Sequence, residues 1–276
     1  MDLKTALRQG VELLEKAGIS APRLTAEVLL CYAVGRERSY LFGHPEEELG
    51  ETEWIHYGRY LHQRLAGTPT QHITRRQEFY GRDFLVTPEV LIPRPETEHV
   101  VGEALRLAGY ASTLVDIGCG SGALAVTMKL ETNAEVWATD ISTAALAVAR
   151  ENARRLSASV RLVACDLAGA LRDRAFDLVI SNPPYVPWTG RESLQREVRD
   201  HEPAVALFGG PTGAEFYARL VPEAARLLRP GGWLIVELGF RIEEAVRALF
   251  DGRWSGPEVT PDLAGWPRVL AARYSP

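Results

Sequence analysis

Four consecutive residues, Asn182-Pro183-Pro184-Tyr185, have the composition of a stiff polar loop. Each proline fixes its φ angle and lacks a backbone N–H donor. The side-chain oxygen of Asn182 and a nearby backbone carbonyl can then point at one spot as acceptors. Two convergent acceptors suit a planar NH2 group, either a carboxamide or the exocyclic amine of a base, over which Tyr185 can lay its ring. The alternative interpretation is an Asx-type turn at the end of a strand.

A glycine-rich turn precedes this loop along the chain. Gly118, Gly120 and Gly122 follow an apolar run at 113–117 and open a helical pattern. Glycine lets the backbone turn tightly and approach a ligand closely. The spacing is Gly-x-Gly-x-Gly and differs from the Gly-x-Gly-x-x-Gly of dinucleotide-binding proteins. The segment therefore predicts either a ligand-binding turn or only a tight connection between a strand and a helix.

Acidic residues end two further predicted strands. Asp140 follows the strand at 135–139 and can accept hydrogen bonds from both hydroxyls of a ribose, or cap the next helix. Asp166 follows the strand at 159–164 and can accept from an adenine amine, or act as a cap. Together with Asn182, these residues end successive strands, and open α/β sheets bind ligands at that edge. The constellation predicts a cofactor that contains a nucleoside.

S-adenosylmethionine fits this constellation better than NAD or ATP. No Gly-Lys-Ser/Thr triplet follows the glycines, and no partner for a pyrophosphate is evident in the sequence. S-adenosylmethionine has a ribose, an adenine and an amino-acid tail but no phosphate. Its sulfonium would also bring an electrophilic methyl group near Asn182. We therefore expect this cofactor and no metal ion.

Alternating strands and helices position these residues. The candidate strands are 113–117, 135–139, 159–164, 176–181 and 232–237. Helical patterns lie between most of them, which is typical of a parallel sheet with covering helices. The last two strand-like runs, 253–259 and 268–274, have no helix-length segment between them. They predict an antiparallel hairpin at the end of the sheet.

The chain before residue 94 has two different patterns. Residues 1–76 show apolar side chains at helical spacing, with Gly18 at a helix end and Pro22 in a first turn, and predict a small helical bundle. Residues 77–93 mix aromatic and branched side chains with turn residues and predict a β-hairpin linker. The third predicted domain, at 94–276, carries the residues described above.

Composition narrows the possible partners and compartments. The chain has 276 residues, a formal net charge of −5 and a pI of about 5.8. General binders of phosphate backbones are normally basic, so we expect no direct nucleic-acid partner. No apolar stretch approaches the roughly 18 residues that span a bilayer, so we expect no membrane partner. The widely separated Cys31, Cys119 and Cys165 fit a reduced cytoplasm, and we expect a monomer.

The sequence resembles a known family, the class I methyltransferases that methylate glutamine N5 in the Gly-Gly-Gln loop of bacterial peptide-chain release factors. The resemblance covers nearly the whole chain. Its most specific segments are residues 93–98 and 197–203, whereas Asn-Pro-Pro-Tyr is shared with amine methyltransferases that act on DNA and RNA. In the first segment, Arg94 and Glu96 have a simpler alternative interpretation as a linker charge and a helix-start carboxylate. In the second, Arg199, Asp200 and Glu202 can equally belong to a solvated loop.

The resemblance implies the fold and the partners. The fold is a Rossmann-like class I methyltransferase with a seven-stranded, mostly parallel sheet and an antiparallel terminal strand, plus the helical bundle and the β-hairpin linker. The bundle at residues 1–76 would dock the substrate protein. Release factors would be the partners and S-adenosylmethionine the methyl donor.

The resemblance also implies roles for site residues. The glycines would pack on the methionine part of the cofactor, Asp140 would hold the ribose, and Leu167 would form an apolar lid on the adenine. The predicted cofactor-binding residues are Asp116, Gly118, Cys119, Gly120, Ser121, Gly122, Asp140, Asp166, Leu167 and Asn182. The predicted substrate-binding residues are Asn182, Pro183, Pro184 and Tyr185, of which Asn182, Pro183 and Tyr185 are the predicted catalytic residues.

Three alternatives remain at this point. A sibling enzyme that acts on a glutamine of a ribosomal protein has the same chemistry and differs only in docking; Pro22, Arg23 and the 197–203 segment favour the release-factor branch. A methyltransferase for amines of nucleic-acid bases would need a flipped base and phosphate contacts. The acidic pI argues against it. A noncatalytic cofactor-binding protein would have no use for an intact Asn182–Tyr185 loop.

Overall fold

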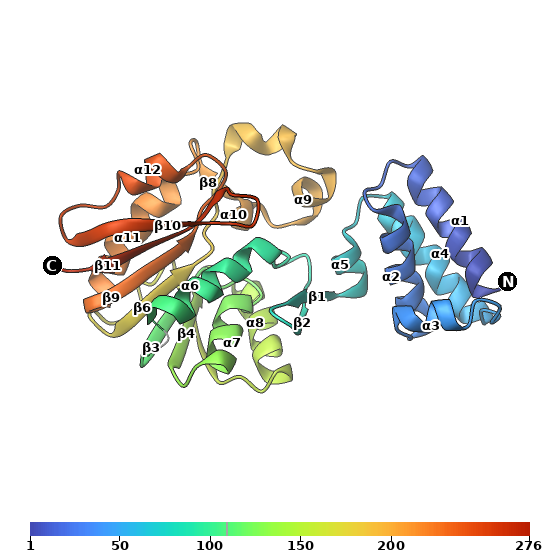
Figure 1. The fold of residues 1–276 in the computed structure, drawn as a ribbon, viewed down its shortest axis with the longest axis horizontal. Coiled ribbons are helices and arrows are strands. Elements are labelled where there is room, and N and C mark those ends of the chain that lie inside the picture. Colours follow the sequence, from blue (N-terminus) through green and yellow to red (C-terminus); the bar gives the residue numbers. More distant parts are fainter. Residues whose placement is uncertain (109) are drawn as a thin grey trace. The chain divides into compact units, whose positions relative to one another are not determined.

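The structure is a computed structural model that describes residues 1–108 and 110–276. The described chain divides into two compact units, which are drawn in Figure 1. The first unit comprises residues 1–76 together with 195–201, and the second comprises 77–194 together with 202–276. Among the described residues, no helix is both long enough and apolar enough to cross a membrane.

The first unit is a small helical bundle. Its helices are α1 (Leu3–Lys16), α2 (Pro22–Val34), α3 (Arg38–Gly43), α4 (Glu51–Leu65), α5 (Thr70–Thr74) and α9 (Arg196–His201). The Asp2 side chain caps α1 by accepting a hydrogen bond from the backbone N–H of Thr5 at 2.7 Å. Leu14, Leu29 and Tyr57 are fully buried in the core of the bundle. The structure therefore contains the helical bundle that the apolar spacing predicts.

One segment of the predicted methyltransferase domain groups with this helical unit. Residues 195–201, which include α9, lie outside the second unit although the sequence places them within 94–276. Glu197 forms an ion pair with Arg64 of α4 at 2.5 Å, and the Arg64 side chain is only 7% exposed. A local sequence pattern could not reveal this pairing, because the two residues are far apart in the chain.

A short β-hairpin begins the second unit. Its strands are β1 (Arg76–Phe79) and β2 (Arg82–Leu85), although Arg76 itself is assigned to the helical unit. Tyr80 and Gly81 form the turn, with φ angles of 51° and 72°. Two positive φ angles in succession match the twist of a two-residue hairpin. The hairpin is thus shorter than the predicted span of 77–93, and Val90 and Ile92 beyond it are buried without belonging to a strand.

A seven-stranded sheet forms the centre of the second unit. Its strands are β3 (Thr113–Ile117), β4 (Glu135–Asp140), β5 (Val160–Ala164), β6 (Phe176–Ser181), β9 (Leu228–Glu237), β10 (Trp254–Pro261) and β11 (Pro267–Tyr274). The spatial order is β10-β11-β9-β6-β3-β4-β5. Neighbouring strands from β9 to β5 are parallel, and β11 is antiparallel to both β9 and β10. The predicted mostly parallel sheet with an antiparallel end is confirmed.

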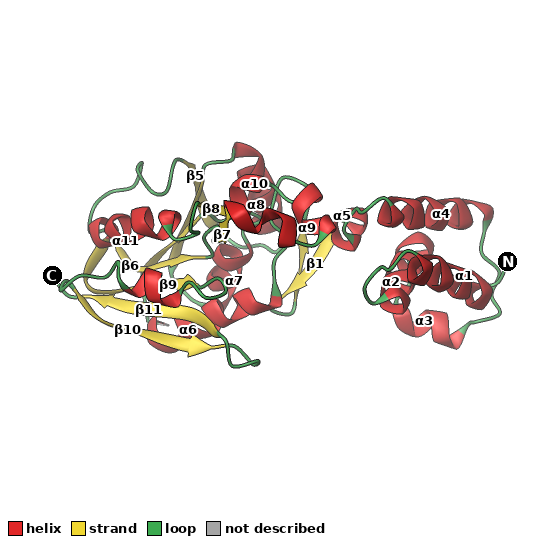
Figure 2. Ribbon diagram, turned by 90° about the horizontal axis from the view of Figure 1, so that it is seen from above, coloured by secondary structure: helices red, strands yellow, loops and turns green. Residues whose placement is uncertain are grey.

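Helices cover both faces of this sheet. The remaining elements are η1 (Pro95–Thr97), α6 (Glu98–Ala108), α7 (Ala123–Glu131), α8 (Thr143–Arg155), β7 (Val186–Pro187), η2 (Trp188–Ser193), α10 (Ala204–Leu207), β8 (Phe208–Gly210), α11 (Glu215–Leu227) and α12 (Glu243–Arg247). Helices α6, α7 and α8 pack on one face, and α11 and α12 pack on the other (Figures 1 and 2). Burial on both faces explains why the parallel strands are nearly continuous apolar runs.

Candidate active site

A cavity of about 370 Å³ lies at the carboxyl ends of β3, β4, β5 and β6. Most of the predicted site residues line it, namely Asp116, Gly118, Cys119, Gly120, Ser121, Asp140, Asp166, Leu167, Asn182 and Pro184. Three predicted residues, Gly122, Pro183 and Tyr185, are absent from the described lining of the cavity. All the lining residues belong to the second unit.

The glycine turn leaves open space beside the backbone. Gly118 and Gly120 have φ angles of 75° and 53°, and a Cβ atom added to either would meet no described atom within 4 Å. The backbone N–H groups of Gly118 and Cys119 both donate to the carbonyl of Thr139 at 2.9 Å, which ties the turn to the end of β4. A ligand in the cavity can therefore approach this backbone closely.

Gly122 has a packing role instead. A Cβ atom on this residue would lie 3.1 Å from the Cβ of Ala149 on α8, closer than ordinary van der Waals contact. Its φ angle of 80° also begins α7. Glycine at this position lets α7 and α8 approach each other, and no contact with the cofactor is needed to explain it.

Asp140 lines the cavity and also forms a hydrogen bond to the glycine turn. Its Oδ2 accepts from the backbone N–H of Gly120 at 2.9 Å, and its Oδ1 accepts from the backbone N–H of Ser142 at 2.8 Å. Both oxygens keep a further lone pair. The predicted contact of this carboxylate with ribose hydroxyls is thus compatible with its observed bonds.

Asp116 is a buried carboxylate with one unpartnered oxygen. It is 1% exposed, and its Oδ2 accepts from the backbone N–H of Ala125 at 3.1 Å. Its Oδ1 has no hydrogen-bond partner among the residues that the structure describes. Burial raises the pKa of Asp116 to about 7, and the nearby Asp140 adds to this effect. An unpartnered buried acceptor is costly, which indicates that a ligand donor belongs there.

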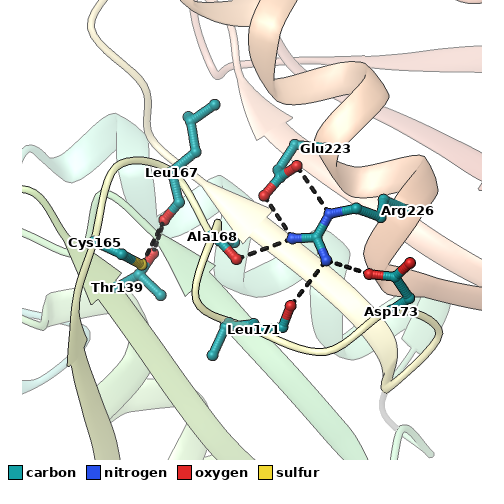
Figure 3. Close-up of polar contacts among 8 residues, drawn as sticks. All are labelled: Thr139, Cys165, Leu167, Ala168, Leu171, Asp173, Glu223 and Arg226. Atoms are coloured by element: carbon teal, nitrogen blue, oxygen red, sulfur yellow. Dashed lines mark hydrogen bonds and ion pairs between the residues drawn. The ribbon is translucent and has the colours of Figure 1, made fainter.

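The loop after β5 is held in a fixed conformation. Two side chains donate to the carbonyl of Leu167 (Figure 3). They are the hydroxyl of Thr139, at 2.6 Å, and the thiol of Cys165, at 3.6 Å. Leu167 has a φ angle of 49°, which is rare for a residue with a branched side chain. The anchored carbonyl keeps Leu167 in the lining of the cavity, where an apolar lid on an adenine is predicted.

Arg226 of α11 anchors the rest of that loop. Its guanidinium donates to the carbonyls of Ala168 and Leu171 at 3.0 and 2.8 Å and also pairs with Asp173 and Glu223 (Figure 3). A planar guanidinium with five donors can satisfy several carbonyls and carboxylates at once. The sequence offers no motif that would identify this anchor.

Asp166 has an ion-pair partner that no sequence pattern indicates. Arg219 of α11 forms an ion pair with it at 2.5 Å, and both side chains are more than half exposed. Arg219 also lines the cavity. The predicted contact of Asp166 with an adenine amine must therefore use an oxygen or lone pair that Arg219 leaves open.

Asn182 lines the cavity and has a buried, unpartnered acceptor. Its Nδ2 donates to Oγ1 of Thr97 at 3.0 Å, and its Oδ1 is buried without a hydrogen-bond partner in the described part of the chain. Thr97, which is 4% exposed, donates its own hydroxyl to Oε2 of Glu237 at 2.6 Å. The Asn182 oxygen thus has no competing hydrogen bond, which is compatible with the predicted acceptor role, and Thr97 also lines the cavity.

Tyr185 contacts Glu237 and Gly239. Its hydroxyl donates to Oε1 of Glu237 at 3.3 Å, and burial raises its pKa. A Cβ atom on Gly239 would come within 2.5 Å of the Tyr185 ring, so the ring packs on that glycine. The structure thus places Tyr185 against β9 and its following turn, in contrast to the expected position over the substrate amide.

Within the second unit, Glu202 of the 197–203 segment contacts residues in and beside the 93–98 segment. Glu202 is 7% exposed, accepts from the backbone N–H of Ile92 at 2.9 Å and forms an ion pair with Arg94. Its interpretation as part of a solvated loop is therefore wrong. Arg199 and Asp200 instead pair with each other at 2.9 Å near the surface. Glu202 fixes the segment whose neighbours Leu91 and Pro93 line the cavity.

Several other cavity residues are not among the predicted site residues. The lining includes the apolar residues Ile141, Trp188, Val205, Phe208 and Phe216, together with the polar residue Glu215. Apolar side chains in loops and at helix starts resemble ordinary core residues. Pro93 and Thr97 lie within the 93–98 segment, which could have marked both as cavity residues.

Comparison with known proteins assigns both units. Residues 5–74 match the family model described as the PrmC N-terminal domain, and residues 100–196 match the methyltransferase small domain. The release factor glutamine methyltransferase of Koribacter versatilis is 44% identical over 277 residues, covering 99% of both chains. The Bacillus subtilis protein of the same name is 38% identical and covers 90% of both chains.

Solved structures support the fold. A methyltransferase from Pyrococcus furiosus has a TM-score of 0.56 and 21% identity, covering 79% of this chain and all of that chain. A 16S rRNA methyltransferase from Thermus thermophilus, solved with AdoMet and guanosine, has a TM-score of 0.50 and 19% identity, covering 72% of this chain and 49% of that chain. At these identities the likeness concerns the fold alone.

The described cavity fits S-adenosylmethionine, which is the methyl donor. The open backbone at Gly118 and Gly120 provides room for the methionine part, and the unpartnered Oδ1 of Asp116 provides an acceptor for an ammonium group. The relatives at 37–44% identity match the chain over 84–99% of their own length, and the two family models match residues 5–74 and 100–196. The chain therefore belongs to the release factor glutamine methyltransferases.

Proposed function

We propose that this protein transfers a methyl group from S-adenosylmethionine to the side-chain amide nitrogen, N5, of the glutamine in the Gly-Gly-Gln loop of peptide-chain release factors. The observation that carries the proposal is the buried, unpartnered Oδ1 of Asn182 in the same cavity as the glycine turn. A neutral oxygen acceptor in that place suits a neutral NH2 group. The names of relatives at 37–44% identity supply the identity of the substrate protein.

The chemical difficulty is the weak nucleophilicity of an amide. The nitrogen lone pair is delocalised into the carbonyl group, and bound S-adenosylmethionine supplies an electrophilic methyl group on its sulfonium. Asn182 Oδ1 would accept one substrate N–H, and the backbone carbonyl of Pro183 would accept the other. With both N–H bonds held, the nitrogen can become more pyramidal and present its lone pair to the methyl group. Positioning of this kind can contribute on the order of 7–11 kcal/mol at its upper end.

No side chain has to remove a proton before the methyl transfer. The methyl group would leave the donor sulfur as the new N–C bond forms, and the nitrogen would then carry a positive charge. Its extra proton becomes strongly acidic and leaves to water. The reaction thus needs only a neutral acceptor at this position, and an asparagine amide meets that need better than a carboxylate would.

The helical unit is the proposed docking surface for the release factor. Residues 5–74 match a domain model specific to this kind of protein, and the unit exposes apolar side chains, including Leu24, Phe42 and Ile55 at 48%, 55% and 59%. We further propose that the protein acts as a monomer in the cytoplasm, where its substrate works, and without a direct nucleic-acid partner.

Loop variants of the substrate test the proposed reaction. The protein is incubated with labelled S-adenosylmethionine and a release factor that carries glutamine, glutamate or asparagine in the Gly-Gly-Gln loop, and the label is located by mass spectrometry. We expect the label on the glutamine amide nitrogen and none on the glutamate variant, which lacks that nitrogen. Equal labelling of all three factors at another residue would refute the proposal.

A further inference from the structure

A chain of buried hydrogen bonds leads from β9 to the cavity. Glu237, the last residue of β9, is 1% exposed and accepts the hydroxyl of Thr97 at 2.6 Å. Thr97 in turn accepts Nδ2 of Asn182 at 3.0 Å. The Oδ1 of Asn182 then has no hydrogen-bond partner within the described residues. The proposed reaction uses Asn182 but leaves the other two side chains without a function.

The proton count of this chain decides which way the Asn182 amide points. A threonine hydroxyl has one proton and two lone pairs, and an ionised carboxylate is an acceptor only. Thr97 must give its proton to Glu237, so it can only accept from Asn182. The NH2 end of the amide is therefore directed to Thr97, and the oxygen end is left without a hydrogen-bond partner among the described residues.

We propose that Glu237, acting through Thr97, is a positioning residue that holds the Asn182 amide with its oxygen toward the substrate. The inference rests on the proposed function, because only an NH2 substrate requires an acceptor there. If the amide turned over, an NH2 group would face the substrate NH2, and two donors cannot share a hydrogen bond. The Thr97–Glu237 pair therefore selects the one orientation of Asn182 that can bind the glutamine.

The protonation state of Glu237 should control this orientation. Burial raises the pKa of Glu237 to about 7, and the negative charge of Glu96 also raises it. The hydrogen bond from Thr97, the charge of Arg268 and the hydrogen bond from Tyr185 act in the opposite direction and lower it. Tyr217 donates to the Glu237 backbone carbonyl at 2.6 Å and so does not neutralise the carboxylate.

A protonated Glu237 can donate to Thr97. The Thr97 hydroxyl can then donate to Asn182, which favours the reversed amide. Because the competent form is the ionised one, turnover should rise with pH and reach a plateau above the pKa of Glu237.

Substitutions at both positions test the relay. Thr97→Val keeps the shape of the side chain and removes the hydroxyl, Thr97→Ser keeps the hydroxyl, and Glu237→Gln keeps the shape but can offer Thr97 either a donor or an acceptor. For each variant, kcat and KM for the release factor are measured between pH 6 and 9 at saturating S-adenosylmethionine, and the affinity for the methyl donor is measured by calorimetry.

The expected result is a loss in kcat that follows the hydroxyl. Thr97→Val should lower kcat by about tenfold or more, the effect of one lost buried hydrogen bond, with donor affinity within about twofold. Thr97→Ser should stay within about threefold of the wild type. In Thr97→Val and Glu237→Gln, kcat should no longer fall between pH 7.5 and 6, because the first variant breaks the link to Asn182 and the second removes the titrating carboxyl group.

Two features of the experiment isolate the relay. Thr127→Val is the matched control, since Thr127 is fully buried and its hydroxyl has no partner among the described residues, yet it does not line the cavity. This variant should keep the wild-type kcat and pH profile. Saturating donor is needed because Asp116, whose pKa burial also raises to about 7, lines the same cavity and would act on donor binding.

The outcomes separate the inference from the proposed function. Unchanged kcat and an unchanged acid limb in Thr97→Val, with normal methylation by the wild type, would overturn the inference alone. A loss of equal size in Thr127→Val would also overturn it, because the effect would then belong to any buried threonine. Failure of the wild type to methylate the glutamine would overturn the proposed function and the inference together.

Discussion

Asp116 on β3 and Glu237 on β9 occupy the two strands that flank β6 in the sheet. Each is 1% exposed, and burial raises the pKa of each to about 7. Their surroundings differ. Glu237 accepts hydrogen bonds at both oxygens, from Thr97 and Tyr185, whereas Oδ1 of Asp116 has no partner among the residues described. Asp116 thus has one oxygen left to accept a hydrogen bond from a ligand, whereas both oxygens of Glu237 are already bonded.

This difference explains how one cavity can bind two chemically distinct reactants, the methyl donor and the glutamine. An unpartnered carboxylate oxygen suits a cation, and the methionine part of S-adenosylmethionine carries an ammonium group. A neutral amide oxygen suits the NH2 of a glutamine, which has to keep its protons until the methyl group has transferred. The Glu237 carboxylate therefore acts on the substrate only through Thr97 and Asn182, and its negative charge does not contact the substrate.

The largest expected effect breaks the acceptor side at Asn182. Asn182→Ala removes the Oδ1 acceptor and should lower kcat by about 100-fold, because a reactant that is misplaced by about 1 Å can lose that much rate. Affinity for S-adenosylmethionine should remain within about threefold, since the donor side is intact. Steady-state kinetics and calorimetry measure the two quantities.

Asn133→Ala is the matched control for this prediction. Asn133 is exposed in the turn between α7 and β4 and does not line the cavity. Its substitution should change neither quantity. Wild-type turnover in Asn182→Ala would show that the acceptor side does not hold the substrate.

The next prediction breaks the donor side at the glycine turn. Gly118→Ala adds a Cβ atom in open space beside the cavity and should weaken binding of S-adenosylmethionine by about tenfold, as one lost close contact of 1.4 kcal/mol would. Gly265→Ala is matched to it, because Gly265 has a φ angle of 82° and no described atom within 4 Å of an added Cβ, but it lies outside the cavity.

Thermal melting separates strain from ligand contact in these two glycine variants. Both should lose about 1 kcal/mol of stability, because alanine is disfavoured at positive φ. Only Gly118→Ala should lose donor affinity. An equal loss of affinity in Gly265→Ala would mean that backbone strain alone explains the effect.

A smaller effect is expected on binding of the whole release factor. If the cavity holds only the glutamine, the helical unit should matter for the whole release factor and not for a short Gly-Gly-Gln peptide. Ile55→Glu should raise KM for the whole factor by about fivefold, as loss of an apolar contact of about 1 kcal/mol would. The KM for the peptide should stay unchanged.

Leu263→Glu serves as the control for docking. Leu263 is 99% exposed and belongs to the second unit. A rise in KM for both variants would indicate a general effect of added negative charge. No change in Ile55→Glu would argue against docking at this face of the helical unit.

The smallest effect concerns the stability of the protein without its cofactor. The pKa of Asp116 is raised from 3.8 to about 7, so its contribution to stability is present below pH 3.8 and is lost as the pH rises through 7. Asp116→Asn removes that loss. The variant should therefore be more stable than the wild type by at least about 1 kcal/mol at pH 8, and the difference should shrink toward pH 5.

Denaturant unfolding at several pH values measures this difference. A difference that does not vary with pH would show that Asp116 does not titrate in the folded protein, and the contrast with Glu237 would then lose its electrostatic basis.

The sequence predicts the parts of the site that follow strand ends. Asp116, Asp140 and Asn182 could be placed in one cavity because parallel strands bring their carboxyl ends to one edge. The relay could not be predicted, since Thr97 and Glu237 are 140 positions apart and each looks ordinary in its own segment. The same holds for the pair of Arg94 and Glu202, which are 108 positions apart.

Packing details account for the remaining differences. Gly122 looks like a ligand-binding glycine in the motif, but the closeness of Ala149 on α8 gives it a packing role. Tyr185 follows the substrate loop, yet the absence of a side chain on Gly239 leaves a place for its ring away from the cavity. Such neighbours come from other segments of the chain, and a local pattern does not contain them.

A competition experiment tests the central claim most directly. The protein is given labelled S-adenosylmethionine with equimolar release factor, ribosomal proteins and DNA in one mixture, and mass spectrometry locates every methyl group that is added. We expect the label on the side-chain amide nitrogen of the glutamine in the Gly-Gly-Gln loop, and we expect Asn182→Ala to lower the rate of labelling by about 100-fold. Label on a base amine or on a ribosomal-protein glutamine, with the release factor unmodified, would contradict the account.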